Sequence, residues 1–189
     1  DQIPGLWRDG LMAERTRDFQ TAEHNYHEIL KRIPYVPAYL RIGWLRMQEA
    51  KRYDDSLRYY NKALHEDRDN AEALLASSWL LFKKDTKSSI KEAIARLSYL
   101  IQREPKIYKA MLTFAKSRIT NLSEIAPTIE MLNYAQSAYT DKKTRRAFDK
   151  IIRDLSNQIE SDRQLAAMVV DATPFDAFAP SDPTAAGGA

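Results

Sequence analysis

A pattern of small and apolar residues that recurs three times constrains the fold of this chain more than any other feature of its sequence. Each segment begins with a small residue, and a second small residue follows 12 to 15 positions later. Two aromatic or aliphatic residues then stand four and seven positions after that second small residue. The matching residues are Gly10, Phe19, Ala22, Tyr26, Ile29 and Pro34 in the first segment, Gly43, Tyr53, Ser56, Tyr60 and Ala63 in the second, and Ser78, Ala93, Leu97, Leu100 and Pro105 in the third. The segments start 33 and 35 residues apart, at Gly10, Gly43 and Ser78. An internal repeat of this length predicts stacked copies of one structural unit.

The pattern resembles the tetratricopeptide repeat, a helix-turn-helix unit of about 34 residues. Small residues in both helices of such a unit let the two backbones approach closely, and the larger residues fill the space between neighbouring helix pairs. The resemblance implies an all-α, right-handed superhelical solenoid, with repeats at about 3–35, 36–70 and 71–105. Scarce Gly, five residues in all, agrees with a helical chain that has few turns.

Further helices are expected after the third repeat. Apolar residues recur at helical spacing over 106–119 and over 125–139, so residues 106–139 are predicted to form a degenerate fourth unit and to end the repeat region of 1–139. A capping helix is predicted within 140–170, with Asp141 as its N-cap, and it would close the core of three to four helix pairs. Its predicted apolar face consists of Phe148, Ile151, Ile152, Leu155 and Ile159.

One helix start carries a local signal of its own. Ser89 and Glu92 match the S-x-x-E capping box, which predicts that the second helix of the third unit begins there. The preceding stretch, 85–89, is then expected to be an exposed loop that lengthens the turn of this unit.

The first helices of tetratricopeptide units line a concave groove. Alignment on the first small residue of each unit predicts that the groove is lined by Trp7, Leu11, Leu40, Trp44, Met47, Leu75, Trp79 and Phe82. Because Trp residues often anchor interfaces, this set predicts an apolar groove for a peptide or helix of a partner protein. The alternative is that these Trp residues only pack between neighbouring helices. Some members of the family hold an acidic C-terminus with Lys and Asn at these positions, and the apolar residues found here argue against that activity.

Composition and motifs argue against catalysis and against metal or cofactor binding. The chain has no Cys, which excludes disulfides and thiolate metal sites. It has no Gly-rich phosphate loop and no nucleophile elbow. His24 and His27 lie three residues apart, but no further ligands stand at a recognisable spacing, so we expect surface histidines. We therefore expect neither an enzyme nor a small-molecule substrate.

The charge balance does not favour nucleic-acid binding, because 29 basic residues face 26 acidic ones. An RNA-associated helical-repeat protein stays as an alternative because basic residues gather in the first two units. They are Lys31, Arg32, Arg41, Arg46, Lys51, Arg52, Arg58 and Lys62. No apolar run approaches the roughly 20 residues of a membrane-spanning helix.

A second, local resemblance concerns residues 22–34 and 39–43. Their order is similar to a stretch of the large tetratricopeptide subunit of the polymerase-associated elongation complex of eukaryotes. That likeness implies a nuclear scaffold for an RNA polymerase II elongation factor. The broader expectation is a non-catalytic scaffold or adaptor subunit of a multiprotein complex, inside the cell in the cytoplasm or nucleus. Its partners would be other protein subunits or peptides.

The end of the chain differs from the rest. Residues 171–189 contain no Lys or Arg and are rich in Pro, Ala and Asp, which predicts an extended tail. Phe175 and Phe178 are its only large apolar residues, and they are expected to dock on the helices of this chain or on a neighbouring subunit. Because the chain starts with Asp1 and not with Met, it is expected to be a fragment or a processed form.

Overall fold

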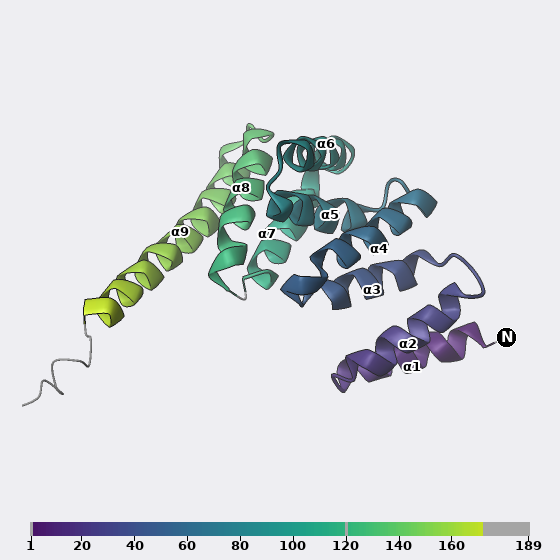
Figure 1. Cartoon of the computed structure of the whole chain (residues 1–189). Helices are drawn as coiled ribbons and strands as arrows, with labels where there is room; N and C mark the ends of the chain where they lie inside the picture. Colours follow the sequence, from purple (N-terminus) through teal and green to yellow (C-terminus); the bar gives the residue numbers. More distant parts are fainter. Residues whose placement is uncertain (1, 120, 172–189) are drawn as a thin grey trace, which may run out of the picture.

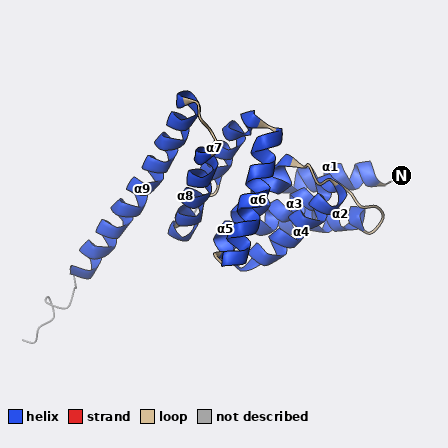
Figure 2. Ribbon diagram, turned by 90° about the horizontal axis from the view of Figure 1, so that it is seen from above, coloured by secondary structure: helices blue, strands red, loops and turns tan. Residues whose placement is uncertain are grey.

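The computed structural model describes residues 2–119 and 121–171, and their side chains, Ala50 apart, as far as residue 164. Every regular element in this part of the chain is helical, which confirms the prediction of an all-α fold (Figures 1 and 2). The elements, with η marking 3-10 helices, are α1 (Ile3–Arg15), α2 (Phe19–Leu30), α3 (Val36–Met47), η1 (Ala50–Arg52), α4 (Tyr53–Glu66), α5 (Ala71–Lys84), α6 (Lys87–Arg103), η2 (Pro105–Ile107), α7 (Tyr108–Ser117), α8 (Leu122–Ser137) and α9 (Lys142–Asp171).

The first six α-helices form three helix pairs, in which α1 packs on α2, α3 on α4, and α5 on α6. The recurring small residues lie where the helices of a pair approach each other. A methyl group added to Gly10 would lie 2.5 Å from Cε1 of Tyr26, and one added to Gly43 would lie 3.0 Å from Cε2 of Tyr60. In the second pair, the Ser56 hydroxyl also donates to the Gly43 carbonyl oxygen at 2.7 Å. Close contact with an aromatic ring of the partner helix therefore leaves no room for a side chain at Gly10 and little room for one at Gly43.

The third pair solves the same packing problem with different residues. Ser78 is fully buried, and its hydroxyl donates to the carbonyl oxygen of Leu74 within α5 at 2.6 Å. Leu97 is also fully buried and stands at the position that Tyr26 and Tyr60 occupy in the first two pairs. Compared with the first two pairs, the third pair thus combines a smaller side chain in α6, Leu in place of Tyr, with a larger one in α5, Ser in place of Gly.

The start of α6 differs from the prediction. The N-cap is Thr86, whose hydroxyl accepts from the backbone N–H of Ser89 at 3.1 Å, while the Ser89 hydroxyl accepts from the backbone N–H of Thr86 at 2.9 Å. The predicted box of Ser89 and Glu92 is therefore wrong by one turn, because Ser89 takes the reciprocal position of the box and not its first one. The predicted loop over 85–89 is also wrong, since α6 begins at Lys87 and Ser89 is buried.

Residues 106–139 pack differently from the first three pairs. The helix α7 makes few contacts with α8, whereas α8 packs extensively on α5 and on α9. Pro127 lies inside α8 and lacks the N–H that would bond the carbonyl oxygen of Ser123, four residues earlier. The Lys83 ammonium of α5 donates to that carbonyl oxygen at 2.7 Å. This hydrogen bond between α5 and α8 therefore satisfies the Ser123 carbonyl oxygen, which Pro127 leaves without a backbone donor.

The buried apolar residues of the described part form two clusters. The smaller cluster lies between α1, α2, α3 and the first half of α4, and consists of Ala13, Ala22, Tyr26, Ile29, Ala38, Ile42, Leu45 and Tyr59. The larger cluster runs from Leu40 in α3 to Leu155 in α9. The helix α3 contributes to both, so it joins the first helix pair to the rest of the molecule.

The last helix, α9, begins as predicted. The Asp141 carboxylate accepts from the backbone N–H of Thr144 at 2.8 Å, as an N-cap does. The buried side chains of α9 include Phe148, Ile151 and Leu155, which confirms most of the predicted apolar face, while Ile152 and Ile159 are half-buried. Packing on α8 uses the first part of α9, and its C-terminal part extends beyond the other helices (Figures 1 and 2).

Candidate protein-binding cleft

The predicted groove residue Trp79 belongs to the core and not to a surface. Its side chain is fully buried, and its Nε1 donates to the Thr128 hydroxyl of α8 at 2.9 Å. The rings of Tyr53 and Phe114 pack against it edge-on, with centroids 5.6 and 6.4 Å away. The prediction that Trp79 lines an open groove is therefore wrong, because α7 and α8 cover this face of α5.

The other predicted groove residues do not form one continuous lining. Met47 and Phe82 are buried in the core like Trp79, and Leu40 is also buried. Trp7 and Leu11 of α1 are half-buried, and the Trp7 ring lies against Tyr26 and Tyr35 in the N-terminal part. The remaining two, Trp44 and Leu75, line an apolar cleft. The tail residues Phe175 and Phe178 lie outside the described residues.

This apolar cleft lies between α3, α5 and α7. It has a volume of about 430 Å³ and is lined by Trp44, Tyr60, Ala71, Glu72, Leu75, Ala76, Ile107, Ala110, Thr113 and Phe114. Its volume is within the range of about 300–1,000 Å³ that is typical of ligand sites in proteins. Trp44 and Phe114 are half-buried, so each ring still offers apolar surface to a partner. The α7 residues were missed from the sequence because α7 carries no repeat signature from which their position could be aligned.

A buried polar network lies behind the cleft. The Arg118 side chain is fully buried, and its Nη2 donates to the Met47 carbonyl oxygen and to Oε1 of Glu124, both at 3.0 Å. The Tyr53 hydroxyl donates to the same Glu124 oxygen. Burial and this neighbouring carboxylate raise the pKa of Tyr53 to about 12. The network therefore ties together α3, α4, α7 and α8.

The same Arg118 contacts both tryptophans. Its guanidinium carbon lies 4.8 Å from the ring centroid of Trp79 and 5.9 Å from that of Trp44. A cation over an aromatic face is attracted to it, and this attraction strengthens where water is excluded. The Arg118 guanidinium, which its own hydrogen bonds hold in place, thus restrains the Trp44 ring on the side away from the cleft. No feature of the sequence distinguished Arg118 from the many surface arginines.

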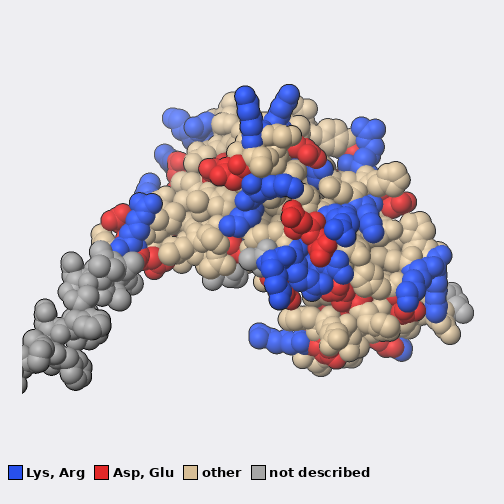
Figure 3. Space-filling model, in the orientation of Figure 1, with Lys and Arg blue, Asp and Glu red and all other residues tan. Residues whose placement is uncertain are grey.

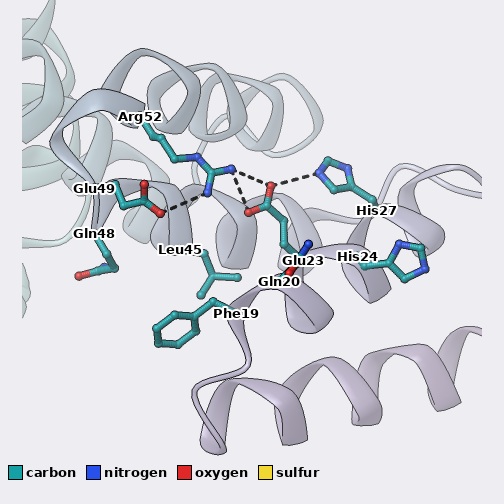
Figure 4. Close-up of a pocket in the computed structure, with 9 residues that line it drawn as sticks. All are labelled: Phe19, Gln20, Glu23, His24, His27, Leu45, Gln48, Glu49 and Arg52. Carbon is teal, nitrogen blue, oxygen red and sulfur yellow. Dashed lines mark hydrogen bonds and ion pairs between the residues drawn. The ribbon is translucent and has the colours of Figure 1, made fainter.

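A second, more polar pocket lies between α2 and the C-terminal end of α3 (Figure 4). Its volume is about 520 Å³, and it is lined by Phe19, Gln20, Glu23, His24, His27, Leu45, Gln48, Glu49 and Arg52. The Glu23 carboxylate lies within 3.6 Å of Nε2 of His27 and accepts hydrogen bonds from Arg52 at 3.0 and 3.1 Å. It also accepts from Nε of Arg46 at 2.9 Å. Its acceptor positions are therefore occupied by side chains of this chain.

The electrostatics of the polar pocket follow from these contacts. Burial raises the pKa of Glu23, but the hydrogen bonds from His27 and Arg46 and the charges of Arg46 and Arg52 outweigh it and lower the pKa to about 2. A carboxylate that is this hard to protonate and already bonded is poorly suited to proton transfer. Over the described residues, no group of three or more His, Asp or Glu side chains could hold a metal ion.

The basic residues of the first two units are largely paired with carboxylates. Lys and Arg alternate with Asp and Glu on the face shown in Figure 3. The ion pairs include Lys31–Glu28, Arg41–Glu14, Arg46–Glu23, Lys51–Glu49, Arg52–Glu23 and Arg58–Asp55. Because these cations already have partners, the pairing does not favour the RNA-associated alternative.

None of the described helices is long and apolar enough to cross a lipid bilayer. Compared with known proteins, the chain matches no protein-family model, no curated protein and no solved structure.

Proposed function

We propose that this chain is a non-catalytic scaffold or adaptor subunit that binds a segment of another protein in the apolar cleft between α3, α5 and α7. The observation that carries the proposal is the cleft itself, which presents the half-buried rings of Trp44 and Phe114. Aromatic anchors in a desolvated pocket account for much of the affinity in protein interfaces. A wall that is already held in place reduces the entropy lost on binding, and Arg118 holds Trp44 in this way.

The proposal includes a tetratricopeptide-like, right-handed superhelical arrangement of the helix pairs. Support comes from the contact of a glycine with an aromatic ring of the partner helix in the first two pairs, and from the burial of Ser78 and Leu97 at the matching positions of the third. Further support comes from the packing of α2 on α3 and of α4 on α5, which joins each pair to the next. The cleft is lined mainly by α3, α5 and α7, which are the first helices of consecutive pairs in this arrangement.

A selection of peptides tests the proposed function. A random dodecapeptide library displayed on phage is selected on the wild-type chain, and enriched peptides are then measured against two cleft variants by fluorescence polarisation. Ala110→Trp places a ring at the exposed α7 edge of the cleft, and Trp44→Ala removes one wall. We expect each variant to weaken the enriched peptides by about tenfold or more.

The matched control is Ala95→Trp, which adds the same ring at an exposed position of α6. This variant should bind the peptides as the wild type does. Circular dichroism of all four proteins verifies that they remain helical. Enriched peptides that bind the cleft variants and the control variant equally well would show that the cleft is not the binding site.

A further inference from the structure

The apolar cleft contains one charged side chain, Glu72, in the first turn of α5. The other nine lining residues are uncharged. Glu72 makes no hydrogen bond or ion pair with any residue in the described part of the chain, in contrast to Glu14 and Glu23. A carboxylate near a helix N-terminus is favoured by the helix dipole, which accounts for an acidic residue at this position. The dipole does not, however, provide a hydrogen-bond donor to the carboxylate of a long Glu side chain.

The opposing charge that acts on Glu72, that of Arg41 of α3, is largely committed elsewhere. Its Nε donates to Oε1 of Glu14 at 2.8 Å, and its Nη2 forms an ion pair with the other oxygen. Glu72 is exposed, so a partner can reach it, yet the surrounding apolar side chains partly exclude water and raise the pKa of its carboxyl. Arg41 opposes this effect only in part. The cleft therefore keeps an uncompensated negative charge at its α5 side.

The α7 side of the cleft carries a net opposite charge. Lys106 and Lys109 line, together with Glu104, an adjacent pocket that shares Ile107 and Ala110 with the cleft. Both lysines are exposed, and neither forms an ion pair with a described residue. A partner that enters the cleft thus meets a carboxylate on one side and ammonium groups on the other.

These charges constrain what can bind. An apolar or acidic segment would cover Glu72 without replacing the water that it loses, and this leaves a charge desolvated and unpaired. We infer that the bound segment carries a large apolar side chain that enters beside Trp44 and a Lys or Arg that pairs with Glu72. This inference rests on the proposed function and adds the chemistry of the partner to it. The cation is expected to point toward α5, because at the α7 edge Lys106 and Lys109 outnumber the one carboxylate there, Glu104.

The peptides selected on the wild-type chain test this inference. Those that depend on the cleft should carry a Lys or Arg within about four positions of a large apolar residue, the distance of one helical turn. Glu72→Gln should weaken them by about three- to tenfold, since one partly desolvated ion pair is lost. The matched control is Glu130→Gln, which removes an exposed carboxylate of α8 outside the cleft and should leave binding unchanged.

Charge reversal separates recognition from a structural effect of Glu72. Glu72→Lys should reject the selected peptides but bind versions in which the basic residue is replaced by Glu. Cleft-dependent peptides that lack a basic residue, or that bind Glu72→Gln as well as the wild type, would overturn the inference and leave the proposed function intact. If no cleft-dependent peptide is enriched, the proposed function itself is wrong, and the inference is wrong with it.

Discussion

Adding one methyl group at Gly10 tests whether close contact between paired helices specifies this fold. In Gly10→Ala the new Cβ would lie 2.5 Å from Cε1 and 2.9 Å from Cζ of Tyr26. Carbon atoms prefer a separation of about 3.5–4.0 Å. The Tyr26 ring is fully buried, and its hydroxyl donates to Glu14 at 2.6 Å, so the ring cannot simply rotate into solvent. The helices α1 and α2 must move apart.

The magnitude follows from two opposing terms. Overpacking of a well-packed core costs about 1–3 kcal/mol. Replacing Gly by Ala inside a helix returns up to about 1 kcal/mol through higher helix propensity. Since the ring is rigid and enclosed, we expect a net loss of about 1–2 kcal/mol, which corresponds to a decrease in melting temperature of about 2–8 °C for a chain of this size.

Two other glycines serve as internal controls. In Gly5→Ala the new methyl group meets nothing within 4 Å, so this variant should be more stable than the wild type by about 0.5–1 kcal/mol. In Gly43→Ala the methyl group lies 3.0 Å from the Tyr60 ring, and its overpacking and helix-propensity effects should nearly cancel. The expected order of melting temperature is therefore Gly5→Ala, then Gly43→Ala, then Gly10→Ala.

The assay is thermal unfolding followed by circular dichroism at 222 nm, with urea unfolding to obtain free energies. The third helix pair suggests a rescue, since it combines Leu97 at the position of Tyr26 with Ser78 at the position of Gly10. In a Tyr26→Leu background, Gly10→Ala should lose most of its cost. Equal melting temperatures for Gly10→Ala and Gly5→Ala, or an unchanged cost in the Tyr26→Leu background, would refute the reasoning.

Three further predictions concern the polar contacts. Arg118→Met should cost about 3–5 kcal/mol in urea unfolding, because Glu124 then stays buried without its cation; the exposed Arg153→Met should cost less than about 0.5 kcal/mol, and equal costs would contradict the account of the network. Glu23→Gln should lower stability at pH 7 by an amount on the order of 3 kcal/mol, because the pKa of about 2 in the folded protein lies below the ordinary Glu pKa of 4.5. That contribution is present above about pH 5 and is lost as the pH falls toward 2, so unfolding curves of wild type and variant should converge in acid; a constant difference would refute it. Thr86→Ala should cost about 1 kcal/mol in urea unfolding through loss of the helix cap, and no change would show that Ser89 caps the helix alone.

The sequence predicted what local spacing controls. Gly10 could be placed at the close approach of two paired helices without a structure, because its spacing to Ala22 marks one helix-turn-helix unit, whereas the Tyr26 ring was expected between neighbouring pairs and lies against Gly10 within the pair. The N-cap Asp141 could be found for the same reason. Local rules did less well at the start of α6, where Thr86 and Ser89 are both competent caps and the sequence alone does not rank them.

Long-range packing accounts for what the sequence did not predict. Trp79 has the expected place on the first helix of its unit, but Thr128, which is 49 residues away in the chain, covers it. Arg118 looks like a surface residue until the carbonyl oxygen of Met47, 71 residues earlier, is brought to it. The cleft likewise depends on α7, and no repeat signature in the sequence predicts that α7 lies beside α3 and α5.

The separation of the buried residues into two clusters joined by α3 has a consequence for how the molecule opens. Detaching α1 and α2 would disrupt only the smaller cluster, so this pair can exchange its amide hydrogens through a partial opening that leaves the larger cluster closed. Amides of α5, which is buried along most of its length, should exchange only on global unfolding. Because the cleft is built on α3, α4, α5 and α7 with η2, fluctuations of the N-terminal pair need not release a bound partner. The first helix pair can thus be replaced or extended with little effect on the walls of the cleft, provided that a carboxylate in the place of Glu14 still holds Arg41.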